Sequence, residues 1–218
     1  MKIAVIGLGQ FGYQLALALA EERHEVLAVD KDERVIDSLK DKVAHAVIAD
    51  AEDPKVLEQL GLEDFDRVCV TIGEDFGASL VVTGNLQELG VEHLYIRSVN
   101  PVHDRLLKLM RIENIIQAEE LAARQLAKRM GIRGATRHFG LSENFGIVEL
   151  HVPEWLVGRK LLEADLRGRC SVNLVTVRRA NGEIIGVPAP DLVFAEGDEL
   201  VVFGTEQSLK AFSNRKGL

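Results

Sequence analysis

The first half of the sequence alternates short apolar runs with longer amphipathic segments. The apolar runs are rich in Val and Ile and lack polar interruption, as strands buried on both faces of a parallel sheet do. In the segments between them, apolar residues recur at the three- and four-residue spacing of a helix. This alternation predicts an α/β fold with helices on both faces of a parallel sheet. The expected strands are 3–6, 26–29, 46–48, 67–72, 93–97 and, as a sixth, 114–116, and the expected helices are 11–22, 33–40, 54–60, 75–89 and 102–110.

The pattern changes after residue 117, where a strong helical segment, 119–130, is followed by the polar, Gly-rich stretch 131–144. Beyond that stretch, apolar and polar residues alternate as they do in half-exposed strands, and Asn181-Gly182 is a hairpin turn signal. We therefore expect a small α+β lobe there. The strands expected in this lobe are 146–152, 172–179 and 199–204, followed by a helix at 206–212. The chain is thus expected to have three parts, namely an N-terminal lobe at 1–117, a helix with a linker at 118–143, and a C-terminal lobe at 144–218.

The composition excludes several classes of protein. With 218 residues and 47% hydrophobic content the chain can build packed cores, so a disordered protein is excluded. Lys and Arg number 26 against 34 Asp and Glu, and the net charge of −8 with scattered basic residues argues against a nucleic-acid partner. No stretch approaches the roughly 18 apolar residues that cross a bilayer, and the N-terminus runs straight into a strand. We therefore expect a cytoplasmic protein with no direct membrane insertion.

The cysteines and histidines carry no pattern of catalysis or metal binding. Cys69 and Cys170 lie far apart without C-x-x-C or His-rich spacing, so both are expected in the core. The second lobe lacks G-x-S-x-G, H-E-x-x-H and paired-carboxylate patterns. Each histidine is expected at the surface or in a turn, and no catalytic residue is assigned, so binding without chemistry is the better interpretation. The histidines are His24, His45, His93, His103, His138 and His151.

The most specific chemical signal is the segment GLGQFG at 7–12, a G-x-G-x-x-G placed between the first strand and the first helix. Gly7 permits the tight turn, Gly9 lets backbone N–H groups approach a diphosphate, and Gly12 lets the helix pack close to the strand. A phosphate would then lie at the positive end of the following helix. The motif in this context predicts a Rossmann-like nucleotide-binding lobe.

Asp30 ends the second strand, eighteen positions after Gly12, where a carboxylate can accept hydrogen bonds from both ribose hydroxyls. A helix cap is the alternative role, but Asp32 already precedes Glu33 as a cap. Because the carboxylate of Asp30 would repel a 2′-phosphate, NADP is disfavoured, which leaves NAD, NADH, ATP or ADP. The ends of the other strands should line the same site. The residues expected to contact the nucleotide are Gly7, Gly9, Gln10, Phe11, Gly12, Asp30, Lys31, Asp50, Ala51, Ile72, Gly73 and Glu74.

Six short segments connect the sequence with a known family. They are 4–12 (AVIGLGQFG), 24–30 (HEVLAVD), 46–51 (AVIADA), 71–75 (TIGED), 115–119 (IIQAE) and 187–190 (VPAP). In these segments the chain resembles the regulator-of-K⁺-conductance (RCK) proteins, specifically the cytoplasmic KtrA/TrkA subunits of bacterial potassium uptake systems. The resemblance covers essentially the whole chain. It implies a Rossmann-like RCK_N (TrkA-N) lobe, a crossover helix and an RCK_C (TrkA-C) lobe.

The resemblance implies a regulatory subunit that assembles as a dimer and, in KtrA-like members, as an octameric ring beneath a membrane K⁺ translocating partner of the KtrB or TrkH kind. Nucleotide exchange in the N-terminal lobes would change the shape of the ring and gate transport, at the inner face of the cell membrane. The crossover helix would present Leu121, Leu126 and Met130 to a neighbouring subunit. An ordinary core stripe within one chain is the alternative.

The resemblance also implies roles for single residues. Glu119 matches a glutamate that contributes, in KtrA-like proteins, to a divalent or monovalent cation site, here for Mg²⁺ or Ca²⁺, next to the nucleotide phosphates at the dimer interface. The alternative is a helix N-terminal acid. Gln10 departs from the family, which commonly has Arg there to reach the γ-phosphate, so the choice between ATP/ADP and NAD/NADH stays open. Arg167 is either an ordinary surface residue or part of a cyclic di-AMP site between paired C-terminal lobes. The residues that match such a site are Leu161, Leu162, Arg167 and Asn173.

Two other functions remain open from the residues. A nucleotide-sensing regulator of a K⁺ channel or exporter would share every residue named above. A small NAD-dependent oxidoreductase, a function of another class, would share Gly7, Gly9, Gly12 and Asp30 with this chain. Such an enzyme needs a proton-transfer group beside the nicotinamide, which the sequence does not supply in a recognisable arrangement.

Overall fold

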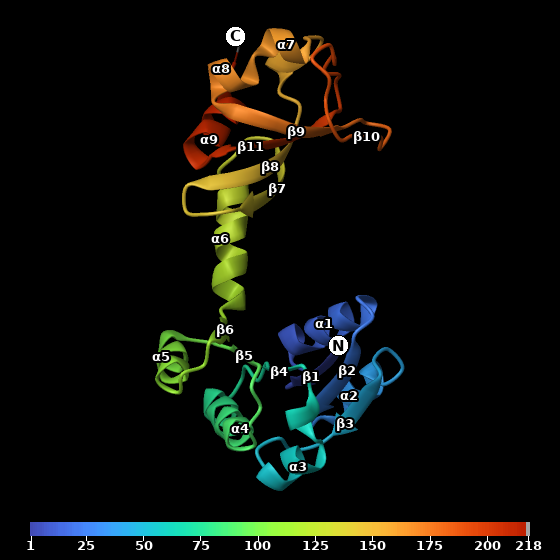
Figure 1. The fold of residues 1–218 in the computed structure, drawn as a ribbon, viewed down its shortest axis with the longest axis vertical. Coiled ribbons are helices and arrows are strands. Elements are labelled where there is room, and N and C mark those ends of the chain that lie inside the picture. Colours follow the sequence, from blue (N-terminus) through green and yellow to red (C-terminus); the bar gives the residue numbers. More distant parts are fainter. Residues whose placement is uncertain (217–218) are drawn as a thin grey trace. The chain divides into compact units, whose positions relative to one another are not determined.

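The computed structural model describes residues 1–216 and divides them into two compact units after Ala118 (Figure 1). We call the unit up to Ala118 the N-lobe and the unit from Glu119 onward the C-lobe. Each lobe has its own sheet and its own hydrophobic core. This division agrees with the change of pattern expected after residue 117.

The N-lobe is built on a parallel sheet of six strands in the order β3-β2-β1-β4-β5-β6 (Figure 1). The order reverses between β1 and β4, and ligands of such sheets bind at the carboxyl edge beside that switch point. All six strands expected from the sequence are present. They are β1 (Lys2–Ile6), β2 (Glu25–Asp30), β3 (His45–Ile48), β4 (Arg67–Val70), β5 (Leu94–Arg97) and β6 (Asn114–Ile116).

Helices cover both faces of this sheet because successive strand side chains point to opposite sides. Ile3 and Val5 join one core with residues of α1 and α2, while Ala4 and Ile6 join a second core with residues of α3, α4 and α5. The five expected helices are present, with ends that differ by at most one residue. They are α1 (Gln10–Glu21), α2 (Glu33–Leu39), α3 (Pro54–Gln59), α4 (Phe76–Glu88) and α5 (Pro101–Leu109), with a short 3-10 helix, η1 (Leu62–Asp64).

The fourth strand is shorter than the expected 67–72. It ends at Val70, and Thr71 instead serves the turn after β1. Its hydroxyl donates to the carbonyl oxygen of Gly7 at 2.5 Å, and its backbone N–H donates to Ile6 O at 2.8 Å. The end of β4 is therefore used to hold the glycine turn.

The C-lobe contains a five-stranded antiparallel sheet in the order β10-β9-β11-β8-β7. Short helices cover one face of it over a core that includes Leu150, Val202, Phe194 and Phe212. The strands are β7 (Ala135–Gly140), β8 (Phe145–His151), β9 (Val172–Arg178), β10 (Ile184–Ile185) and β11 (Glu199–Thr205). The helices are α6 (Ala118–Met130), α7 (Leu161–Ala164), α8 (Leu166–Cys170) and α9 (Glu206–Asn214), with a 3-10 helix, η2 (Glu154–Leu156).

The linker that was expected after the helix, in the range 118–143, contains a strand. β7 pairs with β8 along its length, and the turn between them is closed by a hydrogen bond from the Leu141 N–H to Phe145 O at 2.9 Å. The pattern missed β7 because it is an edge strand in which only His138 is fully buried. The hairpin turn at Asn181-Gly182 is confirmed, since Gly182 has φ +88° and β10 pairs with β9.

Helix α6 is the least buried long helix of the C-lobe. None of its 13 residues is buried, and the side chains of Leu121, Leu126 and Met130 are 59%, 46% and 76% exposed. Within the C-lobe these three residues therefore do not form part of the core. Among residues 1–216, no helix combines the length and the apolar character needed to span a membrane.

Candidate nucleotide-binding site

The glycine turn after β1 has a backbone that only a few residue types tolerate. Gly7 has φ +88°, and its N–H donates to Val29 O at 2.9 Å. A Cβ on Gly7 would lie 2.7 Å from Ile72 Cγ1, and a Cβ on Gly12 would overlap Gly7 O and Thr71 Oγ1. Glycine at these two positions is thus required by the close approach of β1, α1 and the end of β4.

The first turn of α1 is open to a ligand. Gly9 is the N-cap residue and supplies no side-chain cap, and a Cβ there would meet nothing within 4 Å. Free N–H groups in the first turn carry the positive end of the helix dipole. Gln10 and Gly9 are exposed, so an anion can approach these N–H groups directly. The arrangement can bind a phosphate through the backbone.

Asp30 links the glycine turn to the loop after β2. Its Oδ2 accepts the Leu8 N–H at 2.5 Å, and its Oδ1 accepts the Asp32 N–H at 2.9 Å. A carboxylate oxygen can accept more than one hydrogen bond, so these two donors orient the group and leave it able to accept ribose hydroxyls. Asp32 caps α2 by accepting the Arg34 N–H at 2.9 Å, as expected. Hydrogen bonds from Arg34 lower the pKa of the exposed Asp32 carboxyl.

A cavity of about 580 Å³ opens beside the glycine turn. Small-molecule sites commonly have volumes of about 300 to 1,000 Å³. The Lys42 ammonium donates to the Tyr13 hydroxyl oxygen at 3.0 Å, and this hydrogen bond lowers the pKa of Tyr13. Of the residues that line this cavity, the sequence analysis predicted only Gly9 and Gln10. Most of the others come from parts of α1 and α2 that lie beyond the glycine motif. The lining residues are Leu8, Gly9, Gln10, Tyr13, Gln14, Asp32, Arg34, Val35 and Ser38.

The remaining strand ends contribute unequally. Ala51 is 7% exposed and belongs to the core, so its side chain packs inward. Asp50 is exposed and its Oδ1 accepts the Glu52 N–H at 3.1 Å, which orders the turn after β3. Glu74 is exposed and Gly73 is half-buried, both directly after the end of β4, while Lys31 is exposed after β2.

Arg97 is a residue of this edge that sequence reasoning missed. It is the last residue of β5, and its guanidinium carbon lies 5.6 Å from the centroid of the Phe11 ring. A Cβ on Gly73 would lie 2.5 Å from the nearer Arg97 nitrogen, so glycine there leaves room for the guanidinium. The sequence signal that could have identified Arg97 was its position at the end of an expected strand. Arg97 brings to the glycine turn the kind of positive charge that Gln10 lacks.

The residues implied by the resemblance outside this edge are also placed. Glu119 lies in the first turn of α6 and is exposed. Within the described residues no group of three or more His, Cys, Asp or Glu side chains could hold a metal ion. Arg167 and Asn173 are brought together, with Arg167 Nε donating to Asn173 Oδ1 at 2.8 Å. Leu162, in α7, is 73% exposed, and Leu161 is half-buried.

Two histidines contradict the expectation that all six lie at the surface or in turns. His103 is fully buried on α5, where burial lowers its pKa, and His138 is 6% exposed on β7. Both occupy inward positions of their elements, which a pattern that counts histidine as polar does not recognise. The expectation of two core cysteines holds for Cys69, whose burial raises its pKa to about 11, whereas Cys170 is only half-buried.

Comparison with known proteins agrees with this geometry in both lobes. The TrkA-N domain matches residues 3–118, and the TrkA-C domain matches residues 146–217. The fold and the two domains define a chain with a Rossmann-like nucleotide lobe followed by a small C-terminal lobe. This chain belongs to the KtrA/TrkA family of RCK proteins.

Two relatives come from Bacillus subtilis (strain 168). The Ktr system potassium uptake protein C is 35% identical over 214 residues, which cover 98% of this chain and 96% of that protein. The Ktr system potassium uptake protein A is 30% identical over 213 residues, with coverage of 98% and 96%. The similarity therefore extends along both lobes of each relative.

Solved structures with the same fold include two GsuK channel chains. The GsuK channel has a TM-score of 0.65 at 21% identity, and the GsuK channel bound to NAD has a TM-score of 0.64 at 18% identity. They cover 100% and 97% of this chain but only 39% of each channel chain, so the chain spans less than half the length of those channels. At these identities the likeness shows the fold alone.

Proposed function

We propose that this protein is a nucleotide-binding regulatory subunit that gates a membrane K⁺ translocating partner of a Ktr- or Trk-type uptake system. The observation that carries the proposal is the Asp30 carboxylate bonded to the glycine turn, in a chain that matches Ktr potassium uptake proteins along 98% of its length. The turn, the open end of α1 and the adjacent cavity together suit a dinucleotide or an adenosine phosphate.

The nucleotide is ATP/ADP or NAD/NADH. The Arg97 guanidinium near Phe11 supports a ligand with terminal phosphates. It can take the place of the positive charge that an arginine at position 10 would supply. The NAD found in a GsuK channel of the same fold supports the dinucleotide. A divalent cation, Mg²⁺ or Ca²⁺, would bridge the nucleotide phosphates and Glu119.

Helix α6 supports the proposed assembly. Its exposed Leu126 and Met130, four residues apart, share one face of α6, and a second copy of the chain would cover that face and the exposed Leu121. We assign the protein to homo-oligomers, dimers that build an octameric ring, at the inner face of the membrane beneath a KtrB- or TrkH-like partner. Cyclic di-AMP between paired C-lobes would meet the Arg167 guanidinium, with Leu162 on an exposed helix beside it.

Gating requires that a ligand bind two shapes of the assembly with different affinity. ATP and ADP differ by a γ-phosphate, and that phosphate with its cation can supply the difference. Oxidised and reduced NAD differ by one hydride and one charge at the nicotinamide. ATP/ADP and NAD/NADH would therefore act through different parts of the site. Binding measurements distinguish which of these two pairs the protein uses.

The proposal is tested by calorimetric titration of nucleotide-stripped protein with ATP, ADP, NAD and NADH, each with and without Mg²⁺ or Ca²⁺. Saturable binding of one of these pairs, lost in Asp30→Ala and kept in Asp53→Ala, supports it, because Asp53 is a matched carboxylate that caps the next helix, α3. No binding of any of the four nucleotides would contradict the site. In cells, loss of the protein should impair growth at low external K⁺, and unchanged K⁺ uptake would contradict the function.

A nucleotide-sensing regulator of a K⁺ channel is the second candidate, supported by the fold shared with the GsuK channels. Co-purification of the membrane partner distinguishes it from an uptake subunit. Stoichiometric oxidation of NADH with a substrate would instead favour the oxidoreductase alternative.

A further inference from the structure

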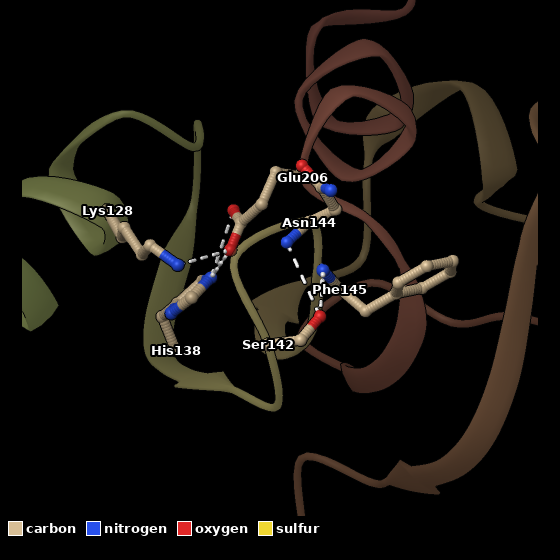
Figure 2. Close-up of polar contacts among 6 residues, drawn as sticks. All are labelled: Lys128, His138, Ser142, Asn144, Phe145 and Glu206. Carbon is tan, nitrogen blue, oxygen red and sulfur yellow. Dashed lines mark hydrogen bonds and ion pairs between the residues drawn. The ribbon is translucent and has the colours of Figure 1, made fainter.

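Three charged or titratable side chains meet in the C-lobe, far from the glycine turn in sequence. They are Lys128 in the last turn of α6, His138 on β7 and Glu206, the first residue of α9 (Figure 2). Lys128 Nζ donates to Glu206 Oε1 at 2.8 Å, and His138 Nε2 lies 3.1 and 3.2 Å from the two Glu206 carboxylate oxygens. One carboxylate thus holds a helix end and a strand together. We call these three residues the α6 latch.

The latch is withdrawn from water at His138 and Glu206 and partly open at Lys128. The side chain of His138 is 0% exposed, that of Glu206 is 18% exposed and that of Lys128 is 36% exposed. Because a carboxylate can only accept, the His138 Nε2 carries the shared hydrogen. Burial acts to raise the pKa of Glu206, but the hydrogen bond from Lys128, the positive charges of His138 and Lys128 and the hydrogen bond from His138 together outweigh it, and the pKa is lowered. At neutral pH, Glu206 is therefore an anion with two donors.

The surrounding backbone is shaped to this cluster. A Cβ on Gly146 would lie 3.1 Å from His138 Nε2 and 3.4 Å from Glu206 Oε1, and a Cβ on Gly140 would lie 3.4 Å from Lys128 Nζ. Glycine at these positions lets the β7–β8 hairpin approach the three side chains closely.

The hairpin turn also positions the main chain of Glu206. The Ser142 hydroxyl oxygen accepts the N–H groups of Asn144 and Phe145 at 3.4 and 3.2 Å, as Figure 2 shows. Asn144 O in turn accepts the Glu206 N–H at 2.9 Å. The carboxylate is therefore presented from an ordered turn.

The position of Lys128 on α6 decides what the latch does. Ile132, just after the helix, is 3% exposed in the C-lobe core and fixes one point of the chain. A helix held at one point can still pivot about it. Lys128 lies four residues earlier, about 6 Å along the helix axis, and its ion pair supplies a second point. Two points define a direction.

We propose that Lys128, His138 and Glu206 fix the direction of α6 relative to the C-lobe sheet, so that Glu119 at the far end of α6 and the C-lobe move as one body. Residues 131–134, which contain two glycines, then form a stiff junction instead of a hinge. Lys128, His138 and Glu206 are positioning residues in this proposal. A regulatory role for this joint movement of α6 and the C-lobe rests on the proposed function. The stiffness of the junction does not, because it needs no nucleotide.

The first test is hydrogen exchange of the full chain without nucleotide, comparing Lys128→Met, Glu206→Gln and the double variant with the parent protein. Each single variant should speed amide exchange in 131–134 about tenfold, because a hydrogen bond between charged groups is lost. The double variant should add little, because both changes remove the same pair. Arg124→Met is the matched control, since Arg124 forms its ion pair with Glu120, a neighbour on the same helix. Unchanged exchange at the junction in both single variants would overturn the proposal.

The second test measures direction, which local loosening alone would not change. Spin labels at Leu121→Cys and Ile184→Cys, both on exposed side chains, are placed in a Cys170→Ser background and diluted with unlabelled protein. The distance distribution within one chain should be narrow in the parent and at least twofold broader in Glu206→Gln and Lys128→Met. Equal widths would overturn the latch. Since no nucleotide is present, failure of nucleotide binding leaves both results interpretable.

Discussion

The carboxylate of Asp30 accepts a hydrogen bond from the backbone N–H of Leu8 at 2.5 Å, and these two residues are 22 positions apart in the sequence. The bond joins the end of β2 to the glycine turn after β1. Asp30 therefore supports the glycine turn, and in the proposed site the same carboxylate would also accept the ribose hydroxyls.

Replacing Asp30 should weaken nucleotide binding strongly. Asp30→Ala removes a charged acceptor together with the bond that orders the turn, at a cost of about 1.5 to 3 kcal/mol, or roughly 10- to 150-fold in Kd. Calorimetry of the best-binding nucleotide measures this change. Asp53→Ala, which removes the cap of α3, should lower stability without a change in Kd. Equal affinity of Asp30→Ala and the parent would place the ribose elsewhere.

Two glycines in N-lobe helices should respond in opposite ways to alanine. Gly12→Ala forces a Cβ against Gly7 O and Thr71 Oγ1, so the free energy of unfolding should fall by about 1 to 3 kcal/mol. Gly84 lies within α4 with nothing within 4 Å of a Cβ, so Gly84→Ala should raise stability by about 0.5 to 1 kcal/mol. Denaturant titration of both variants measures the contrast. A stable Gly12→Ala protein would mean that α1 can shift away from β1.

Charge near the glycine turn should tune the preference for ATP over ADP. Gln10→Arg adds a guanidinium at the open end of α1, and we expect ATP affinity to rise about tenfold relative to ADP at low salt. Arg97→Gln should lower ATP affinity by a similar factor, because the cation near Phe11 is lost. Competition binding at two salt concentrations gives both ratios. If neither variant changes the ATP-to-ADP ratio, the γ-phosphate does not lie at this end of α1.

The effect of a metal ion on ATP binding should require Glu119. Glu119→Gln keeps the size of the side chain but removes the charge that a hard cation requires, so Mg²⁺ or Ca²⁺ should no longer strengthen ATP binding. Titrations with and without metal, on parent and variant, measure the effect. Glu120→Gln is the control on the same turn of α6. Persistent metal dependence in Glu119→Gln would show that the cation is held by other ligands.

Acid sensitivity of the fold should include a contribution from His103. Burial lowers the pKa of His103 in the folded chain, whereas the unfolded imidazole takes up a proton near pH 6.5. The unfolded state therefore binds more protons just below that pH, and the free energy of unfolding decreases as pH falls through this window. His103→Leu should flatten the decrease between about pH 7 and 5.5, and the exposed His93→Leu should not. Identical pH profiles for the parent and His103→Leu would contradict this assignment.

Much of the N-lobe could be predicted because its signals are local. Each strand is a continuous apolar run, and each helix has its own periodicity and, at Asp32, its own cap. The C-lobe was harder, since β7 is an edge strand with a single buried residue and α7 and α8 have only four and five residues. One turn of helix contains too few positions for a period to be recognised.

The sequence by itself determined the parallel sheet, the glycine turn and the candidate role of Asp30, because spacing along the chain decides which side chains share a strand end or a helix face. Only the tertiary structure decided where Arg97 lies, that His103 is buried, and that Lys128 meets Glu206 across 78 positions. Such contacts depend on how whole elements pack. No local pattern records the distance between two side chains that the fold brings together.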